Sequence, residues 1–218
     1  MISPARLLNW PVPMPLIKRD AVTAPAAGDR PDDVASHIAA LSGSDAQARW
    51  SAARALRGRA DAIPALAAAL RVEQEPHVRE AIMTAIMRVG DEASVAVLLP
   101  YIRSQDAGER AAAIEALQAL PEAILPFLPE LFSDSDSDVR VLATELARNV
   151  PAADATHALC ALLEREQHAN VCAAAIDVLA EVGTRDAIPV LKACAERFAG
   201  TPFVPFAVSI AIARIPDS

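Results

Sequence analysis

Apolar and polar positions recur along the chain with a helical period, and the helices that this pattern predicts come in pairs. From Pro31 onwards, apolar residues return at steps of three and four within successive segments. The first segment of each pair starts near an acidic residue, which suits the positive end of a helix dipole. These starts are Asp32, Asp61, Glu92, Glu122, Asp154 and Asp186. The pattern therefore predicts a series of helical hairpins.

One position of the second helix defines the repeat. Arginine occupies it at positions 49, 79, 110 and 140, and Cys172 and Val204 stand in the same position further on. A nearly constant step between these positions is typical of stacked solenoid repeats, whose periods lie between about 20 and 50 residues. Small and apolar residues follow this position in fixed columns, which predicts one continuous core shared by all hairpins.

The residues between the segments agree with this organisation. Gly58, Gly90 and Gly183 follow second helices, where we expect each to end the helix in a left-handed conformation. The string SDSDSD at 133–138 supplies capping residues for the next helix. Prolines fall at predicted helix starts and in the segment 1–30, so they are compatible with a helical protein.

The segment 1–30 differs from the rest and is predicted to form a flexible, proline-rich N-terminal tail before a solenoid over 31–218. The string LLNWPVPMPLI is apolar but punctuated by proline, so we expect it to be extended. Two interpretations remain open for this tail. It is either a disordered segment or a docking peptide, in cis or in trans, whose anchors include Leu7, Trp10 and Leu16.

The repeated residues resemble a known family. Val139-Arg140 with Ala143 and Leu146, and the phrases DAIPAL at 61–66 and DAIPVL at 186–191, resemble HEAT repeats. The spacing is similar to the short bacterial subtype first described in phycobilisome lyases. The resemblance covers roughly the range 31–215 and implies an all-α fold, a right-handed α-solenoid of about six HEAT-like helical hairpins.

The resemblance also implies a ladder in which each repeated arginine contacts a turn aspartate. The partners expected here are Asp45, Asp106, and Asp136 or Asp138. An anion site built from the four arginines is the alternative to this structural role. Because the ladder stops at Cys172 and Val204, the last two hairpins are expected to stack by apolar packing alone.

Charge and composition exclude several functions. The net charge is −8, and since the segment 1–30 is net positive by two, the remainder carries −10. Non-specific nucleic-acid binding needs clustered Lys and Arg, so we expect no nucleic-acid partner and no HEAT-like DNA glycosylase. No His-Glu pair supports a HEAT-type di-iron hydroxylase. No apolar window predicts a membrane span or signal peptide, and three cysteines within helical segments indicate reduced thiols and a cytoplasmic location.

No catalytic residue, cofactor or metal site is predicted, although one cluster has the residue types of a metal site. His157 and Cys160, and His168 and Cys172, share helix faces, with Cys194 one helix further on. Such residues bind zinc or iron when they converge. The competing interpretation is core cysteines and solvated histidines. The enzyme-class alternative for the whole chain is a bilin-lyase-like or other cofactor-handling HEAT subunit.

The column five residues after the arginine position is expected to project from the core. It contains Arg54, Thr84, Glu115, Glu145, Asp177 and Ser209. Second helices line the concave face of a HEAT solenoid, as the resemblance implies. This column is then either a solvated face or a groove that recognises a basic segment of another protein. We predict a non-enzymatic protein-protein interaction adaptor or regulatory scaffold, with partner-binding residues Trp50, Arg54, Glu115, Glu145 and Asp177.

The C-terminal segment is a second candidate contact. It is apolar at Phe203, Val204, Phe206, Val208, Ile210 and Ile212. A terminal repeat normally needs a polar outer face to remain soluble. We therefore expect this face to be covered by a second copy in a homodimer, by a partner helix, or by the N-terminal tail.

Overall fold

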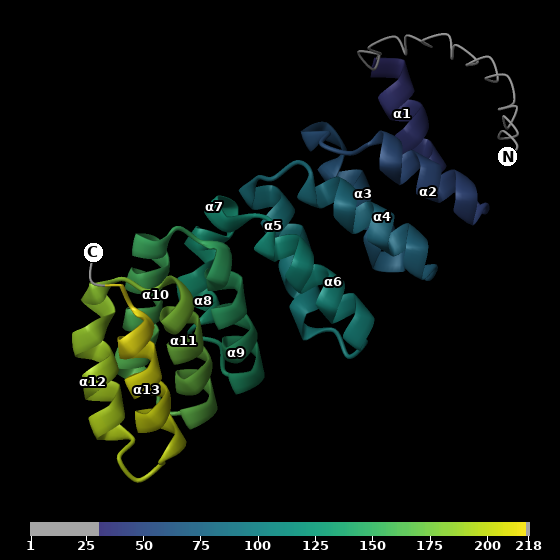
Figure 1. The fold of residues 1–218 in the computed structure, drawn as a ribbon. Coiled ribbons are helices and arrows are strands. Elements are labelled where there is room, and N and C mark those ends of the chain that lie inside the picture. Colours follow the sequence, from purple (N-terminus) through teal and green to yellow (C-terminus); the bar gives the residue numbers. More distant parts are fainter. Residues whose placement is uncertain (1–30, 217–218) are drawn as a thin grey trace, which may run out of the picture.

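The chain folds into six helical hairpins stacked in an elongated, curved array (Figure 1). The computed structural model describes residues 31–216, so the predictions for the tail over 1–30 lie outside the described residues. The described part is all-helical, which confirms the predicted α-solenoid. The hairpins are α1 (Pro31–Ala40) with α2 (Ala46–Ala55), α3 (Ile63–Val72) with α4 (Pro76–Met87), α5 (Glu92–Leu98) with α6 (Ala107–Gln118), α7 (Pro121–Ile124) and α8 (Leu128–Leu131) with α9 (Ser137–Leu146), α10 (Ala152–Arg165) with α11 (Ala169–Val182), and α12 (Ile188–Arg197) with α13 (Phe203–Arg214).

Several first helices are interrupted by short 3-10 segments, and proline explains where. Pro64 and Pro189 stand in the first turns of α3 and α12, where a missing N–H costs no hydrogen bond. Pro100 and Pro126 lie within 3-10 segments because proline cannot donate to the α-helical ladder. The segments are η1 (Ala60–Ala62), η2 (Leu99–Arg103), η3 (Leu125–Phe127) and η5 (Arg185–Ala187), while η4 (Ala147–Asn149) ends α9.

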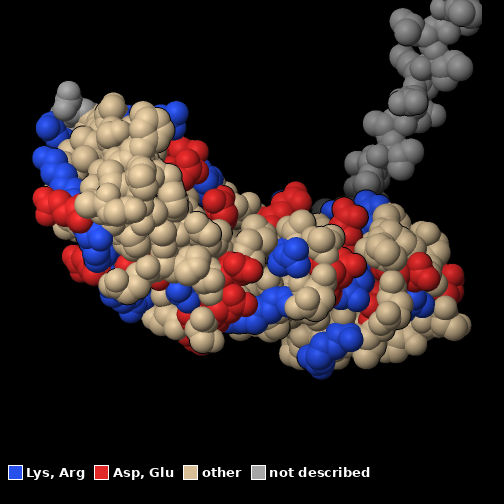
Figure 2. All heavy atoms as spheres, turned by 90° about the horizontal axis from the view of Figure 1, so that it is seen from below, with Lys and Arg blue, Asp and Glu red and all other residues tan. Residues whose placement is uncertain are grey.

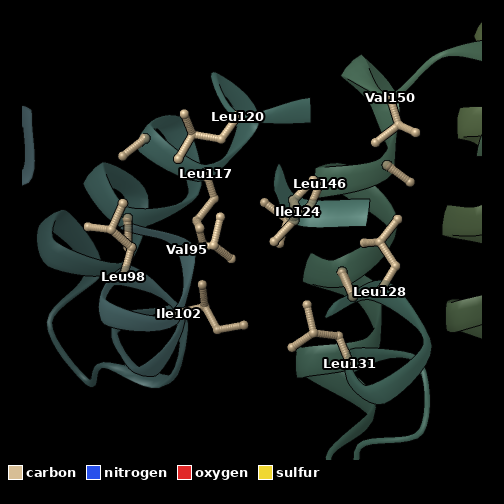
Figure 3. Close-up of a cluster of buried hydrophobic side chains, with 14 of the residues drawn as sticks. Val95, Leu98, Ile102, Leu117, Leu120, Ile124, Leu128, Leu131, Leu146 and Val150 are labelled. Carbon is tan, nitrogen blue, oxygen red and sulfur yellow. The ribbon is translucent and has the colours of Figure 1, made fainter. Parts of the chain in front are cut away.

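One hydrophobic core runs through the array, as the repeating columns predicted. At the junction of the third and fourth hairpins, Leu98 and Leu117 face Ile124 and Leu128 (Figure 3), and all four are fully buried. The column three residues after the arginine position is equally buried in the first five hairpins, at Ala52, Ile82, Ala113, Ala143 and Ala175. Small residues there let neighbouring second helices approach closely.

The second helices line the inner side of the curve. At every junction, neighbouring second helices contact each other more extensively than neighbouring first helices do. The more tightly spaced side of a curved stack is its concave side. The contacts of α6 with α4 and with α9 are the sparsest between second helices, so the array is packed most loosely at its middle.

Two of the three glycines behave as predicted and the third does not. Gly58 and Gly90 have φ values of 74° and 80°, the left-handed conformation expected after a second helix. The prediction for Gly183 was wrong, because its φ and ψ of −67° and 148° are extended. Glycine is required there for space: a Cβ would lie 2.4 Å from the carbonyl oxygen of Leu179.

The repeated arginines bind backbone carbonyls within their own hairpins. Arg49, Arg79, Arg110 and Arg140 each donate to the carbonyl oxygen of the residue six positions earlier. The thiol of Cys172 makes the corresponding contact with the carbonyl oxygen of Glu166, at 3.8 Å. The arginine position therefore closes the turn between first and second helices.

Between hairpins the ladder uses glutamates, and the prediction of aspartate partners was wrong. Arg49 binds Glu73 of the next hairpin in a bidentate pair of 2.6 and 2.9 Å, and Arg140 binds Glu166 at 2.7 and 3.1 Å. Arg79 pairs with Glu109. The aspartates instead cap second helices through side-chain bonds to backbone N–H groups, at Asp45, Asp106 and Asp136. Three of the four arginines thus have glutamate partners, which disfavours the anion-site alternative.

The last two hairpins are joined by polar contacts as well as by their apolar core, so the expectation of apolar packing alone was wrong. Arg197 of α12 donates to the carbonyl oxygen of Leu163 in α10. The N–H of Thr184 donates to the Thr156 hydroxyl at 2.9 Å. These bonds stand in place of the arginine ladder at this junction. The loop before α12 donates its Thr184 N–H to a side chain of the neighbouring first helix, α10.

In the described part of the chain, no single helix is both long and apolar enough to cross a membrane. The pair Ala107–Gln118 and Pro121–Leu131, bent by 101°, meets the requirement only jointly, and by length and composition alone.

Candidate protein-interaction groove

The column predicted to project from the core does so. Arg54, Glu115 and Asp177 are exposed, and Thr84 and Glu145 are half-buried. They lie on α2, α4, α6, α9 and α11, and so along the concave side. The sequence thus placed these side chains on the concave face, where the structure has them. In the structure, however, they form separate clusters and not one continuous stripe.

Trp50 and Arg54 form the first part of the site. The Arg54 guanidinium lies over the indole ring, 4.4 Å from its centroid, because residues four apart on α2 are neighbours on the helix surface. Arg57 follows at the end of the helix, where its Nε donates to the Arg54 carbonyl oxygen at 3.2 Å. These three side chains and His77 of α4 line a cavity of about 210 Å³.

Two further cavities continue from this one across α4 to α6. The larger, of about 550 Å³, is lined by Glu80, Met83 and Glu115, and the smaller, of about 130 Å³, shares these three residues. Glu80 lines all three cavities, so they adjoin one another. We call them together the α2–α6 groove. Its α4–α6 part lies where the array is loosely packed, whereas its first cavity lies beside the extensively packed pair α2 and α4.

The carboxylates of this groove differ in whether their charge is balanced. Among the described residues, no ion pair involves Glu80 or Glu115. Glu109 is paired with Arg79, and Asp106 caps α6 by accepting from the Glu109 N–H at 2.8 Å. Glu80 and Glu115 are therefore the carboxylates available to an incoming cation. Figure 2 shows acidic and basic residues scattered over the face seen from below, without a large area of one sign.

Glu145 and Asp177 belong to a different cluster, centred on Arg148. This arginine binds Glu145 at 3.1 Å, Asp177 at 3.2 Å, and also Glu181. The hydrogen bonds that Arg148 donates to Glu145, and next to Glu181, raise the Arg148 pKa above its ordinary value. Because Arg148 lies on η4 after α9 and the latter two carboxylates lie on α11, this cluster ties neighbouring hairpins together.

Comparison of the sequence with known protein families agrees with this architecture of stacked hairpins. The chain matches HEAT repeats over residues 34–118 and 124–198, which is most of its length and five of its six hairpins. The chain belongs to the HEAT-repeat family. No curated protein matches it.

Three of the solved structures that are similar to this HEAT-repeat protein are engineered or designed proteins. An engineered protein from a structural genomics consortium is 21% identical over 85% of this chain and 99% of its own, with a TM-score of 0.42. A designed armadillo repeat protein is 18% identical over 84% of this chain and all of its own, with a TM-score of 0.40. A further engineered protein is 23% identical over 85% of this chain and 59% of its own, at 0.41.

Sequence reasoning missed Glu80 and Arg148, although the HEAT columns contain the signal. Glu80 stands one residue after the arginine position, in the same column as Trp50. Arg148 stands eight residues after it, in the same column as Arg57. The columns one, five and eight residues after the arginine position lie on one helix face, because they are separated by four and three residues. Considering the neighbouring columns together would have found both residues.

The Cys/His cluster is not assembled as a metal site in the part of the chain that the structure describes. Cys172 and Cys194 are fully buried in the HEAT core, and Cys160 is half-buried. Burial raises the pKa of the Cys160 thiol to about 11, so it remains protonated at neutral pH. Cys160 packs as a small apolar side chain, and the Cys172 thiol contacts the Glu166 carbonyl oxygen.

Proposed function

We propose that this HEAT-repeat protein is a non-enzymatic adaptor or scaffold that binds a basic segment of a partner polypeptide in the α2–α6 groove. The observation that carries the proposal is the presence of two unpaired carboxylates, Glu80 and Glu115, in a groove that a half-buried tryptophan also lines. Charged groups without partners at an interface steer association and fix its orientation. Tryptophan is enriched among the residues that dominate binding energy.

The groove favours one orientation of the bound segment. A lysine or arginine of the partner would lie between Glu80 on α4 and Glu115 on α6, while its apolar neighbours contact Met83, whose flexible side chain adapts to different shapes. Arg54 and Arg57 provide positive charge at the α2 end. We therefore infer a segment with its basic residues toward α6 and an acidic residue or carboxylate toward α2.

The proposal changes the roles given to two of the residues expected from the sequence. Trp50, Arg54 and Glu115 remain partner-binding residues, joined by Glu80. Glu145 and Asp177 are proposed to act through their ion pairs with Arg148, which hold α9 and α11 in register beside the groove.

The test is selection of peptides from a displayed random library against the full chain, followed by titration of the selected peptides. We expect basic peptides whose affinity falls at least roughly tenfold in the double variant Glu80→Lys with Glu115→Lys, since two attractive charges become repulsive. The association rate should also fall as salt is added. The matched control is Glu130→Lys with Glu164→Lys, two exposed positions on α8 and α10 that make the same change of charge outside the groove.

Two outcomes would contradict this function. Selected peptides that bind the groove variant and the wild type equally would remove the groove from the binding surface. A stoichiometric visible-light absorber that copurifies with the chain from its native host would favour the cofactor-handling alternative instead.

A further inference from the structure

The last helix of the array exposes a row of large apolar side chains. Phe203, Phe206 and Ile210 of α13 have exposed fractions of 46%, 68% and 40%. Their spacing of three and four places them in one stripe along the helix. The only charged residue of α13 is Arg214, at its C-terminal end. Figure 2 shows a wide area without charged residues at this end of the molecule.

Counted from the repeat position, two of the three stripe residues, Phe203 and Ile210, stand in columns that are buried in most of the other hairpins. Phe203 stands immediately before the repeat position, where Val78, Val139 and Val171 are 3% exposed or less. The column of Ile210, six residues after the repeat position, is likewise buried at Ala85, Ala116, Leu146 and Val178. In the first hairpin the same two columns are less buried, at Ala48 and Ala55. The helix α13 itself packs against α11 in the most extensive contact between described helices. Among the described residues, no helix covers the stripe on α13.

We propose that a second copy of this chain covers the stripe, with the two α13 helices packed antiparallel about a two-fold axis. In this arrangement each stripe of Phe203, Phe206 and Ile210 meets the same stripe of the partner, as an isologous interface requires. The antiparallel orientation separates the two Arg214 side chains to opposite ends of the contact, so like charges do not oppose it.

The first hairpin of a second copy is a poorer candidate to cover the α13 stripe than the second copy's own α13. The first hairpin exposes the polar side chains Asp33, Ser36, Gln47 and Ser51. A head-to-tail contact would bury these polar groups against phenylalanine without hydrogen-bond partners, at a cost of roughly 1–3 kcal/mol for each group. Burying apolar surface against apolar surface avoids that cost, which favours the two-fold contact over a filament.

The N-terminal tail of the same chain is also a poorer candidate to cover the α13 stripe. Its apolar segment, 7–17, is joined to α1 through the segment 18–30, and α1 and α13 lie at opposite ends of the array (Figure 1). Five steps of packed helices span roughly 40–50 Å. Thirteen or fourteen residues reach about that distance only when fully extended, and their average span as a flexible linker is roughly 20 Å.

The contact is expected to be reversible. Two helices bury less than the roughly 800 Å² per partner of a standard stable interface. We therefore expect a dimer that dissociates in the micromolar range. Dimerisation would place two α2–α6 grooves in one assembly, but the inference does not depend on the function proposed for the groove.

Sedimentation velocity of the full chain over a concentration series tests the proposal. We expect a monomer–dimer equilibrium, with a dissociation constant raised on the order of 100-fold by Phe206→Glu, because each dimer would bury two new charges and lose two phenylalanines. Ile210→Lys should act in the same direction. The matched control is Val72→Glu, which alters a side chain of similar exposure, 73%, on α3. Because all three positions are exposed, circular dichroism should show unchanged helicity.

The tail provides the second arm of the experiment. The full-length variant with Leu7, Trp10 and Leu16 all changed to Ser should dimerise as the wild type does. A wild-type chain that stays monomeric at every concentration would overturn the proposal. So would dimerisation that survives Phe206→Glu, or a tail variant that gains or loses the dimer, since the tail would then be the occupant.

Discussion

At the scale of single residues, the fold depends on ion pairs between a repeated arginine and a glutamate of the next hairpin. Glu73 is the clearest case. It is 6% exposed, accepts both bonds of the Arg49 guanidinium, and also accepts from the N–H groups of Gln74 and Glu75. The hydrogen bond from Arg49 is the main cause that lowers the Glu73 pKa to about 2. This carboxylate therefore links adjacent hairpins in its ionised form.

We expect Glu73→Gln to lower the free energy of unfolding at pH 7 by on the order of 2 kcal/mol, since the half-buried Arg49 guanidinium loses its charged partner. The pKa of Glu73 is lower in the folded than in the unfolded chain. Its stabilisation is therefore present above about pH 4.5 and is lost as the pH falls toward 2. Urea unfolding at pH 7 and near pH 2 measures the difference between variant and wild type, which should shrink at the lower pH.

The control for this experiment is Glu75→Gln, two residues further on, where the side chain is exposed. It should change the free energy of unfolding by less than about 0.5 kcal/mol. If Glu73→Gln behaves like this control at both pH values, the ladder contributes nothing to stability.

At the scale of helices, the Arg148 cluster joins α9 to α11 through three carboxylates. We expect Arg148→Gln to lower the free energy of unfolding by about 1–2 kcal/mol, because it removes three ion pairs and leaves Glu145, Asp177 and Glu181 to repel one another. The difference from wild type, measured by thermal or urea unfolding, should decrease in about 1 M salt, where the Debye length is about 3 Å.

Arg57→Gln is the matched control for this effect. Arg57 stands in the same column, just after α2, but its guanidinium donates to a backbone carbonyl oxygen. Among the described residues, no carboxylate of another helix binds it. Its substitution should leave stability nearly unchanged at either salt concentration. An equal loss in both variants would mean that the Arg148 cluster does not connect the two helices.

The helices themselves could be predicted from the sequence because their signals are local. Apolar spacing, acidic helix starts and the period of the arginine position predicted six hairpins with starts within a few residues of those observed. The partners across hairpins could not be predicted in the same way. Glu73 pairs with an arginine 24 residues away, and its selection over Asp45 depends on where two turns meet after stacking. The aspartates were already engaged by the N–H groups of their own helices.

The candidate site was predicted in part for the same reason. A single column identified Arg54 and Glu115, because exposure follows from helical spacing. Whether a carboxylate is free or paired depends on the neighbouring helix, so Glu115 and Glu145 looked equivalent in the sequence. Only the packing of α9 against α11 distinguishes them, since it brings Arg148 between Glu145 and Asp177.

At the scale of the whole molecule, the array is not equally strong along its length. Second helices pack extensively at both ends, from α2 to α4 and from α9 to α13, and sparsely where α6 meets α4 and α9. In a solenoid each hairpin contacts only its neighbours, so stability is a sum of hairpin terms and junction terms. The weakest junctions therefore set where the array separates into cooperative units.

We expect native-state hydrogen exchange in low urea to show two units with different opening free energies, one over α1–α4 and one over α9–α13. The C-terminal unit should be the more protected, because α11 contacts α13 most extensively. Amides of α6 should exchange with the lower of the two free energies, since neither neighbour holds this helix firmly. The measurement follows exchange by mass spectrometry as urea increases. A single opening free energy shared by α2, α6 and α11 would show instead that the loose junctions transmit cooperativity, and that the groove between α4 and α6 is as rigid as the ends.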